Sequence, residues 1–255
     1  MKLAGRHWAG DKARPALALH CSMGSSSYWG PIAARLGGIV DLHAFDAPGH
    51  GRSGPHEPDG TDYHTQLTGL AAARLPSGGK ADLIGHSLGA TVALRLAVEN
   101  PARVRTLTLI EPVMFAALPD AGSVFTRVDA LLAEGRDEDA TREFLGNWGD
   151  KPFDALPAAA RQRMTAQMRI VAEVNDSLVH DRARMLAAGR LEAVTAPVML
   201  IRGADSPGSI ARIEEALAAR LPDARQAVVA GAAHMVPITH PDDVAALIAE
   251  NLARA

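Results

Sequence analysis

Gly85-His86-Ser87-Leu88-Gly89 is the stretch that decides the fold. It follows the apolar run 81–84, which predicts a buried strand, and precedes residues 90–97, whose pattern predicts a helix. A serine between a strand and a helix sits on a sharp turn, and glycine two positions away on either side relieves the crowding there. The N–H groups that begin the helix, that of Leu88 first, can stabilise negative charge on a carbonyl oxygen under attack. Ser87 is therefore a candidate nucleophile.

A serine hydroxyl needs a base, and His234 is the histidine whose position suits that role. The chain has 10 histidines, so residue type alone selects none of them. His234 comes shortly after the apolar run 227–229, which places it on a loop after a late predicted strand. We therefore predict that His234 takes the proton of Ser87.

Four segments together resemble the α/β-hydrolase superfamily, in its serine-nucleophile branch, over nearly the whole chain. They are residues 20–29, beginning His20-Cys21-Ser22-Met23-Gly24, residues 46–53, the stretch 85–89, and residues 231–234. The resemblance implies that the backbone N–H of Ser22 is the second oxyanion donor beside that of Leu88. Cys21 stands where the family usually has glycine. For residues 46–53 the resemblance implies a backbone turn without a catalytic role.

Two carboxylates compete for the acid that orients His234. Asp205 follows the predicted strand 197–202, where many family members carry this acid. In those members the acid commonly stands three places after the glycine, and here that place is Ser206. Glu111 ends the preceding predicted strand, and some relatives, certain dehalogenases among them, take their acid from that point. A carboxylate at a strand's C-terminal end faces the ligand side of such a sheet, so Glu111 is preferred and Asp205 stays open.

Apolar runs alternate with helical patterns along most of the chain, which predicts an α/β fold. The alternation indicates a mostly parallel sheet with helices on both faces. Residues 3–9 and 13–17 are expected to add an antiparallel edge, with Gly10-Asp11 at the turn. The other predicted strands are residues 16–20, 39–45, 81–85, 105–110, 197–202 and 225–229.

Residues 112–191 interrupt this alternation with helical patterns alone, at 124–133, 138–148 and 158–178. An all-helical insertion at this point resembles the cap that many α/β-hydrolases place over the active site. We expect a core domain of residues 1–111 and 192–255 and a helical cap or lid of residues 112–191. About one in three of the apolar cap residues is expected to line the pocket and the rest to form core. They are Met114, Phe115, Phe125, Leu131, Leu132, Phe144, Trp148, Met164, Met168 and Val171.

Composition excludes several classes of protein. A net charge of −3 without a basic stripe argues against nucleic acid as a partner. The single cysteine, Cys21, excludes an intramolecular disulfide and indicates a reducing compartment. No targeting segment is visible, and no apolar run reaches the roughly 18 residues that cross a bilayer, so we expect a cytoplasmic protein without a membrane partner. The sequence does not indicate an oligomeric state.

The expected function is that of a carboxylesterase-like serine hydrolase. It would cleave an ester, lactone or thioester of a small to medium, largely apolar substrate through an acyl-enzyme, with no metal or organic cofactor. Serine at position 87 argues against the dehalogenase and epoxide hydrolase branches, whose nucleophile is aspartate. Three alternatives stay open. They are a C–C bond hydrolase or lyase of the same fold, a small-molecule receptor with residual hydrolase activity, and a catalytically idle interaction domain.

Overall fold

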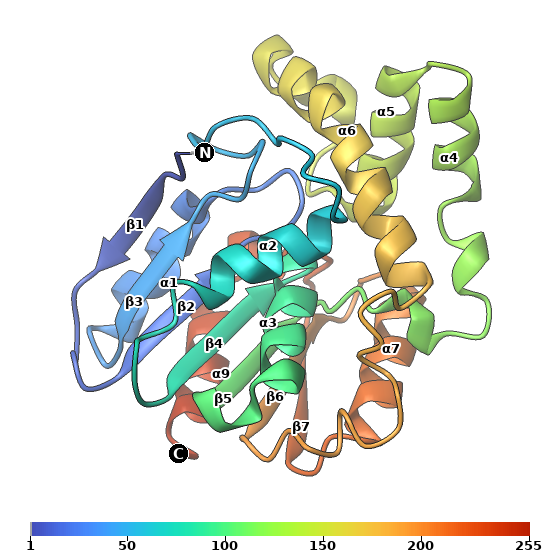
Figure 1. Ribbon diagram of the computed structural model, residues 1–255. Helices are drawn as coiled ribbons and strands as arrows, with labels where there is room; N and C mark the ends of the chain where they lie inside the picture. The colour runs from blue at the N-terminus through green and yellow to red at the C-terminus, as the bar shows by residue number, and fades with distance from the viewer. Residues whose placement is uncertain (1) are drawn as a thin grey trace.

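A seven-stranded sheet runs through the computed structural model, which describes residues 2–255 (Figure 1). In space the strands follow the order β1-β3-β2-β4-β5-β6-β7, and every neighbouring pair is parallel except β1 with β3. The predicted mostly parallel sheet is thus confirmed. The strands are β1 (Gly5–Trp8), β2 (Pro15–Leu19), β3 (Asp41–Phe45), β4 (Ala81–His86), β5 (Val104–Ile110), β6 (Val198–Gly203) and β7 (Ala224–Val229).

The antiparallel edge is present, but its predicted pairing across Gly10-Asp11 is wrong. Strand β1 pairs with β3, Gly5 opposite Phe45 and Trp8 opposite Leu42, whereas β2 lies between β3 and β4. Residues 16–19 of β2 are all buried, so β2 belongs in the interior of the sheet with a parallel partner on each side. The more exposed β1 takes the free edge of β3 instead.

Helices cover both faces of the sheet, as the alternation predicted. Helices α2, α3 and α7 share one buried cluster with Leu17 and Leu19, and α1 and α9 share another with Ala16 and Ala18. Neighbouring residues of β2 therefore point to opposite faces. In Figure 1, α2 and α3 lie in front of the sheet and α9 behind it. The helices are α1 (Gly30–Leu36), α2 (Tyr63–Ala72), α3 (Leu88–Glu99), α4 (Thr126–Ala133), α5 (Asp137–Trp148), α6 (Ala158–Val179), α7 (Gly208–Ala218), α8 (Val236–Thr239) and α9 (Pro241–Leu252).

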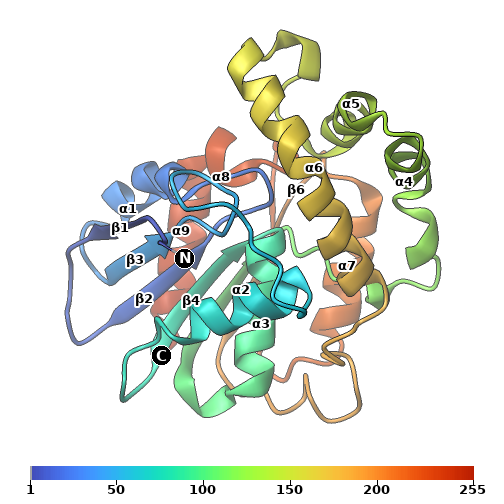
Figure 2. The same ribbon diagram turned by 45° about the horizontal axis from the view of Figure 1, so that its top comes forward.

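Between β5 and β6 the chain forms helices and turns without a strand. Helices α4, α5 and α6 stand together beyond one end of the sheet (Figures 1 and 2). A separate apolar cluster, with Leu131, Leu145 and Met168 among its members, holds these three helices to one another. This is the segment predicted to be a cap, although its division from the core at residues 112 and 191 stays a prediction. Among the described residues, no helix has the length and apolar character that a bilayer crossing requires.

One buried carboxyl group in the core lacks hydrogen bonds. Glu214 of α7 is fully buried, and neither of its oxygens accepts a hydrogen bond from the described residues. Arg202 approaches it, with 3.3 Å between Nε and Oε2. Burial, together with the negative charge of Glu111, raises the pKa of Glu214 from 4.5 to about 8. The folded state therefore favours the protonated form of this side chain.

This pKa predicts how stability depends on pH. Because the folded-state pKa of Glu214 lies above its unfolded value, the folded state is penalised increasingly as pH rises from about 4.5 to about 8. Glu214→Gln removes this titration. The free energy of unfolding of the variant, minus that of the wild type, should therefore be more than about 1 kcal/mol larger at pH 9 than at pH 5. Urea denaturation of both proteins at pH 5, 7 and 9 measures this difference. A difference independent of pH would contradict the assignment.

Candidate active site

Ser87 stands on a strained turn between β4 and α3. Its φ of 55° and ψ of −116° lie where few residues with a side chain are found. A Cβ atom at Gly85 would lie 2.2 Å from the Gly89 carbonyl oxygen, and one at Gly89 would lie 2.2 Å from that of Leu19. Both glycines of the stretch are therefore needed for the turn to pack against its neighbours.

Three of the predicted site residues meet through their side chains at the carboxyl ends of the strands. Ser87 follows β4, Glu111 follows β5, and His234 lies on the loop after β7. His234 Nε2 lies 3.0 Å from Ser87 Oγ, and His234 Nδ1 lies 2.9 Å from Glu111 Oε2. A carboxylate only accepts, so Nδ1–H donates to Glu111, and Nε2 is left to accept from the Ser87 hydroxyl. All three residues are buried.

Glu111, and not Asp205, is the carboxylate at His234. The second oxygen of Glu111, Oε1, accepts from the Gly203 N–H at 2.7 Å and from the Ser206 hydroxyl at 2.6 Å. Three donors thus fix its orientation. Asp205 is exposed, and within residues 2–255 its carboxylate does not contact His234. Ser206 stands three places after Gly203, where the family resemblance implied an acid, and here its hydroxyl donates to Glu111 instead.

The two predicted oxyanion residues lie near the nucleophile. Ser22 borders the cavity at Ser87, and Leu88 directly follows Ser87 as the first residue of α3. Among the described residues, neither backbone N–H donates to a protein acceptor, which leaves both free for a ligand. Neighbouring Cys21 is fully buried, and burial raises the pKa of its thiol to about 12. Its reactive thiolate form is therefore disfavoured.

A hydrogen-bond chain that the sequence did not reveal joins the three loops of the site. The Cys21 N–H donates to Tyr28 Oη at 2.9 Å, and that hydroxyl lies 3.0 Å from His86 Nδ1. The His86 Nε2–H in turn donates to the His234 carbonyl oxygen at 2.9 Å. Burial holds the pKa of His86 well below its ordinary value, so the ring is neutral and can use one nitrogen as acceptor. Tyr28 and His86 thus link the Ser22 loop to the His234 loop.

A cavity of about 140 Å³ opens over Ser87 and His234. Helices α5 and α6 contribute Phe144, Leu145, Trp148 and Met164 to its lining, and the Trp148 ring stands edge-on to His234 with 4.8 Å between centroids. Of the ten apolar residues singled out in the sequence, Phe144, Trp148 and Met164 line this cavity and the others lie in buried clusters. Met235 and Ile238, on the core side, were not anticipated.

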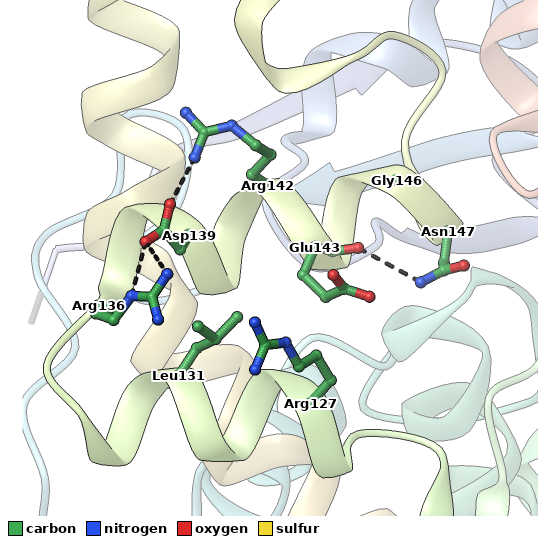
Figure 3. A pocket seen from close by; sticks show the side chains of 8 residues that line it. All are labelled: Arg127, Leu131, Arg136, Asp139, Arg142, Glu143, Gly146 and Asn147. Carbon is green, nitrogen blue, oxygen red and sulfur yellow. Dashed lines mark hydrogen bonds and ion pairs between the residues drawn. The ribbon is translucent and has the colours of Figure 1, made fainter.

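The charges around the cavity are few. Among the described residues, the ionisable side chains in its lining are those of His234, Cys21 and the exposed Asp150, and no arginine contributes to it. A hollow of about 400 Å³ between α4 and α5 does carry arginines, but it shares no lining residue with the cavity at Ser87 (Figure 3). There Arg136 and Arg142 both pair with Asp139, each at 2.8 Å. Arg136 and Arg142 are thus paired locally, and no arginine of this hollow lines the cavity at Ser87.

The chain belongs to the alpha/beta hydrolase family, whose model matches residues 16–247. It is 30% identical over 252 residues to lipase LipV of Mycobacterium tuberculosis, and this alignment covers 92% of each protein. It is also 29% identical to 2-(acetamidomethylene)succinate hydrolase of Mesorhizobium japonicum, over 89% of this chain and 83% of that protein. A solved hydrolase from Pseudomonas aeruginosa PA01 superposes with a TM-score of 0.71 at 25% identity, over 98% of this chain and 94% of that one. The family predicted from four segments of sequence is therefore confirmed, and the relatives support a hydrolase.

The geometry predicts which carboxylate matters for turnover. If Glu111 holds the tautomer of His234, Glu111→Gln should lower kcat by about two to four orders of magnitude in a folded protein. The matched variant Asp205→Asn, on an exposed side chain, should leave kcat within about twofold of the wild type. Steady-state hydrolysis of a short p-nitrophenyl ester by the three proteins measures both effects. Equal losses in the two variants would contradict the assignment.

Proposed function

We propose that the protein is a serine hydrolase that cleaves small, uncharged acyl esters through an acyl-enzyme. The observation that carries the proposal is the unbroken chain Glu111–His234–Ser87, which ends in a cavity with mostly apolar walls. A neutral imidazole between a carboxylate and a serine hydroxyl is the arrangement that activates the serine as a nucleophile.

In the first half of the reaction, His234 Nε2 takes the Ser87 proton as Oγ attacks the acyl carbon. The carbonyl oxygen becomes negative and would accept hydrogen bonds from the N–H groups of Leu88 and Ser22. Glu111 stabilises the imidazolium that forms. The imidazolium then protonates the leaving alcohol, and the acyl group stays on Ser87.

In the second half, His234 takes a proton from water, and the resulting hydroxide attacks the acyl-enzyme. The same two N–H groups would hold the second oxyanion. Return of the proton to Ser87 Oγ releases the carboxylic acid and restores the site. One ester and one water therefore give one acid and one alcohol.

The cavity limits the substrate by size and charge. Its volume of about 140 Å³ is smaller than the roughly 300–1,000 Å³ of sites that hold drug-sized ligands. Phe144, Trp148, Met164 and Ile238 present apolar surface to the acyl group. Because Asp150 is in the lining and the described residues there include no lysine or arginine, an acyl group with its own carboxylate would meet repulsion. A short, neutral acyl chain therefore suits the site best.

A chain-length series tests this proposal. The wild type should hydrolyse p-nitrophenyl acetate and butyrate with a kcat/KM at least about tenfold above that for the dodecanoate. Ser87→Ala should lower the rate with every ester by about 10³-fold or more. Hydrolysis that survives in Ser87→Ala, or no hydrolysis by folded wild type of any ester or thioester in the series, would overturn the proposal.

A matched pair of esters tests the part played by charge. The butyryl and hemisuccinyl p-nitrophenyl esters have acyl chains of equal length, but only the second ends in a carboxylate. We expect the wild type to have a higher kcat/KM for the butyrate than for the hemisuccinate. Asp150→Asn should reduce this ratio, chiefly by lowering KM for the hemisuccinate. An unchanged preference in Asp150→Asn would show that Asp150 does not set it.

A further inference from the structure

Three side chains of types that can ligate a metal ion lie together on the sheet edge opposite to β7, away from the serine site. His7 is on β1, and Asp41 and His43 are on β3. The ladder places His7 directly opposite His43. Asp41 and His43 are two residues apart on one strand, so their side chains share a face of the sheet. The backbone thus presents all three side chains to the same patch of surface.

The three side chains already converge. His7 Nε2 lies 2.8 Å from Asp41 Oδ1, and His43 Nε2 lies 2.9 Å from Asp41 Oδ2. The two imidazole rings are stacked, with 4.2 Å between centroids and 13° between planes. The Gly10 N–H donates to Asp41 Oδ1 at 3.2 Å and helps to orient the carboxylate. All three potential ligand atoms lie within 4.8 Å of one another.

We propose that His7, Asp41 and His43 bind a divalent transition-metal ion of the zinc class. Two imidazole nitrogens and one carboxylate oxygen form a donor set that Zn²⁺, Ni²⁺ and Cu²⁺ accept, whereas Mg²⁺ and Ca²⁺ prefer oxygen alone. Zinc bonds to these atoms measure about 2.0–2.2 Å. Ligand atoms this close together need only small side-chain rotations to surround an ion. Each imidazole would then carry its proton on Nδ1 and bind through Nε2.

The exposure of the ligands allows an ion to enter and water to complete its coordination. The His7 and His43 side chains are 48% and 50% exposed, and that of Asp41 is 15% exposed. The imidazoles border a surface hollow of about 350 Å³. A bound ion would join β1 to β3 through side chains as well as through the ladder, so it should stabilise the edge of the sheet.

Calorimetric titration of tag-free, EDTA-treated protein with Zn²⁺ tests the proposal. The chain should bind one equivalent, and thermal unfolding should move to higher temperature when Zn²⁺ is added. His7→Gln and His43→Gln should each weaken Zn²⁺ binding at least about tenfold. The matched control is His180→Gln, because His180 is also exposed and also lies beside a carboxylate, with 3.1 Å between Nδ1 and Asp176 Oδ1. This control should bind Zn²⁺ like the wild type.

Electron paramagnetic resonance of the Cu²⁺-loaded wild type provides a readout that does not depend on the folding of a variant. Coupling of the unpaired electron to two imidazole nitrogens is the expected result. Binding weaker than about 1 mM, equal binding by the wild type and both glutamine variants, or a Cu²⁺ spectrum without nitrogen coupling would overturn the metal site. Because Ser87→Ala can be titrated in the same way, the result is independent of hydrolysis.

Discussion

The hydrogen bond from His234 to Glu111 is the interaction on which the proposed chemistry depends. It joins a loop after the last strand to the end of a central strand, and it sets which imidazole nitrogen faces Ser87. Glu111 is fully buried, and the Gly203 N–H and Ser206 hydroxyl compensate its charge. The parallel sheet brings these groups together because its strands end at a common edge.

The helices predicted to form a cap and the loops of the sheet both contribute to the cavity at Ser87. The core supplies the serine, the histidine and the free N–H groups, but Trp148 of α5 covers the imidazole of His234 from outside. The same ring packs with Phe115 and Phe125, in a buried cluster that also contains Leu107 of β5 and Leu200 of β6, so the wall of the cavity is anchored against the sheet. In the proposed reaction, a small space enclosed in this way would exclude water from the reacting carbonyl and strengthen the hydrogen bonds to it. In the proposed reaction, size selection and catalysis would therefore depend on the same contacts.

Short sequence patterns were enough to predict the fold and the turn that carries Ser87. The turn at Ser87 needs glycine at 85 and 89, and both glycines lie within one stretch of five residues that can be recognised in the sequence. The choice between Glu111 and Asp205 depended on which carboxylate lies within hydrogen-bond distance of His234. A local sequence pattern does not give that distance. For the same reason the link through Tyr28 and His86 was missed, although both residues lie inside segments that had been singled out. The predicted pairing of β1 with β2 was wrong. It rested on their proximity in sequence, whereas β2 is buried in the interior of the sheet and β1 pairs with β3.

The proposed chemistry requires that Ser87 is an activated nucleophile. The most direct measurement is the intact mass of wild type and Ser87→Ala after treatment with a small fluorophosphonate, which forms a stable bond to such a serine. We expect one adduct per wild-type chain and none on the variant. A folded wild type that gains no adduct, or a variant that gains the same one, would contradict the claim.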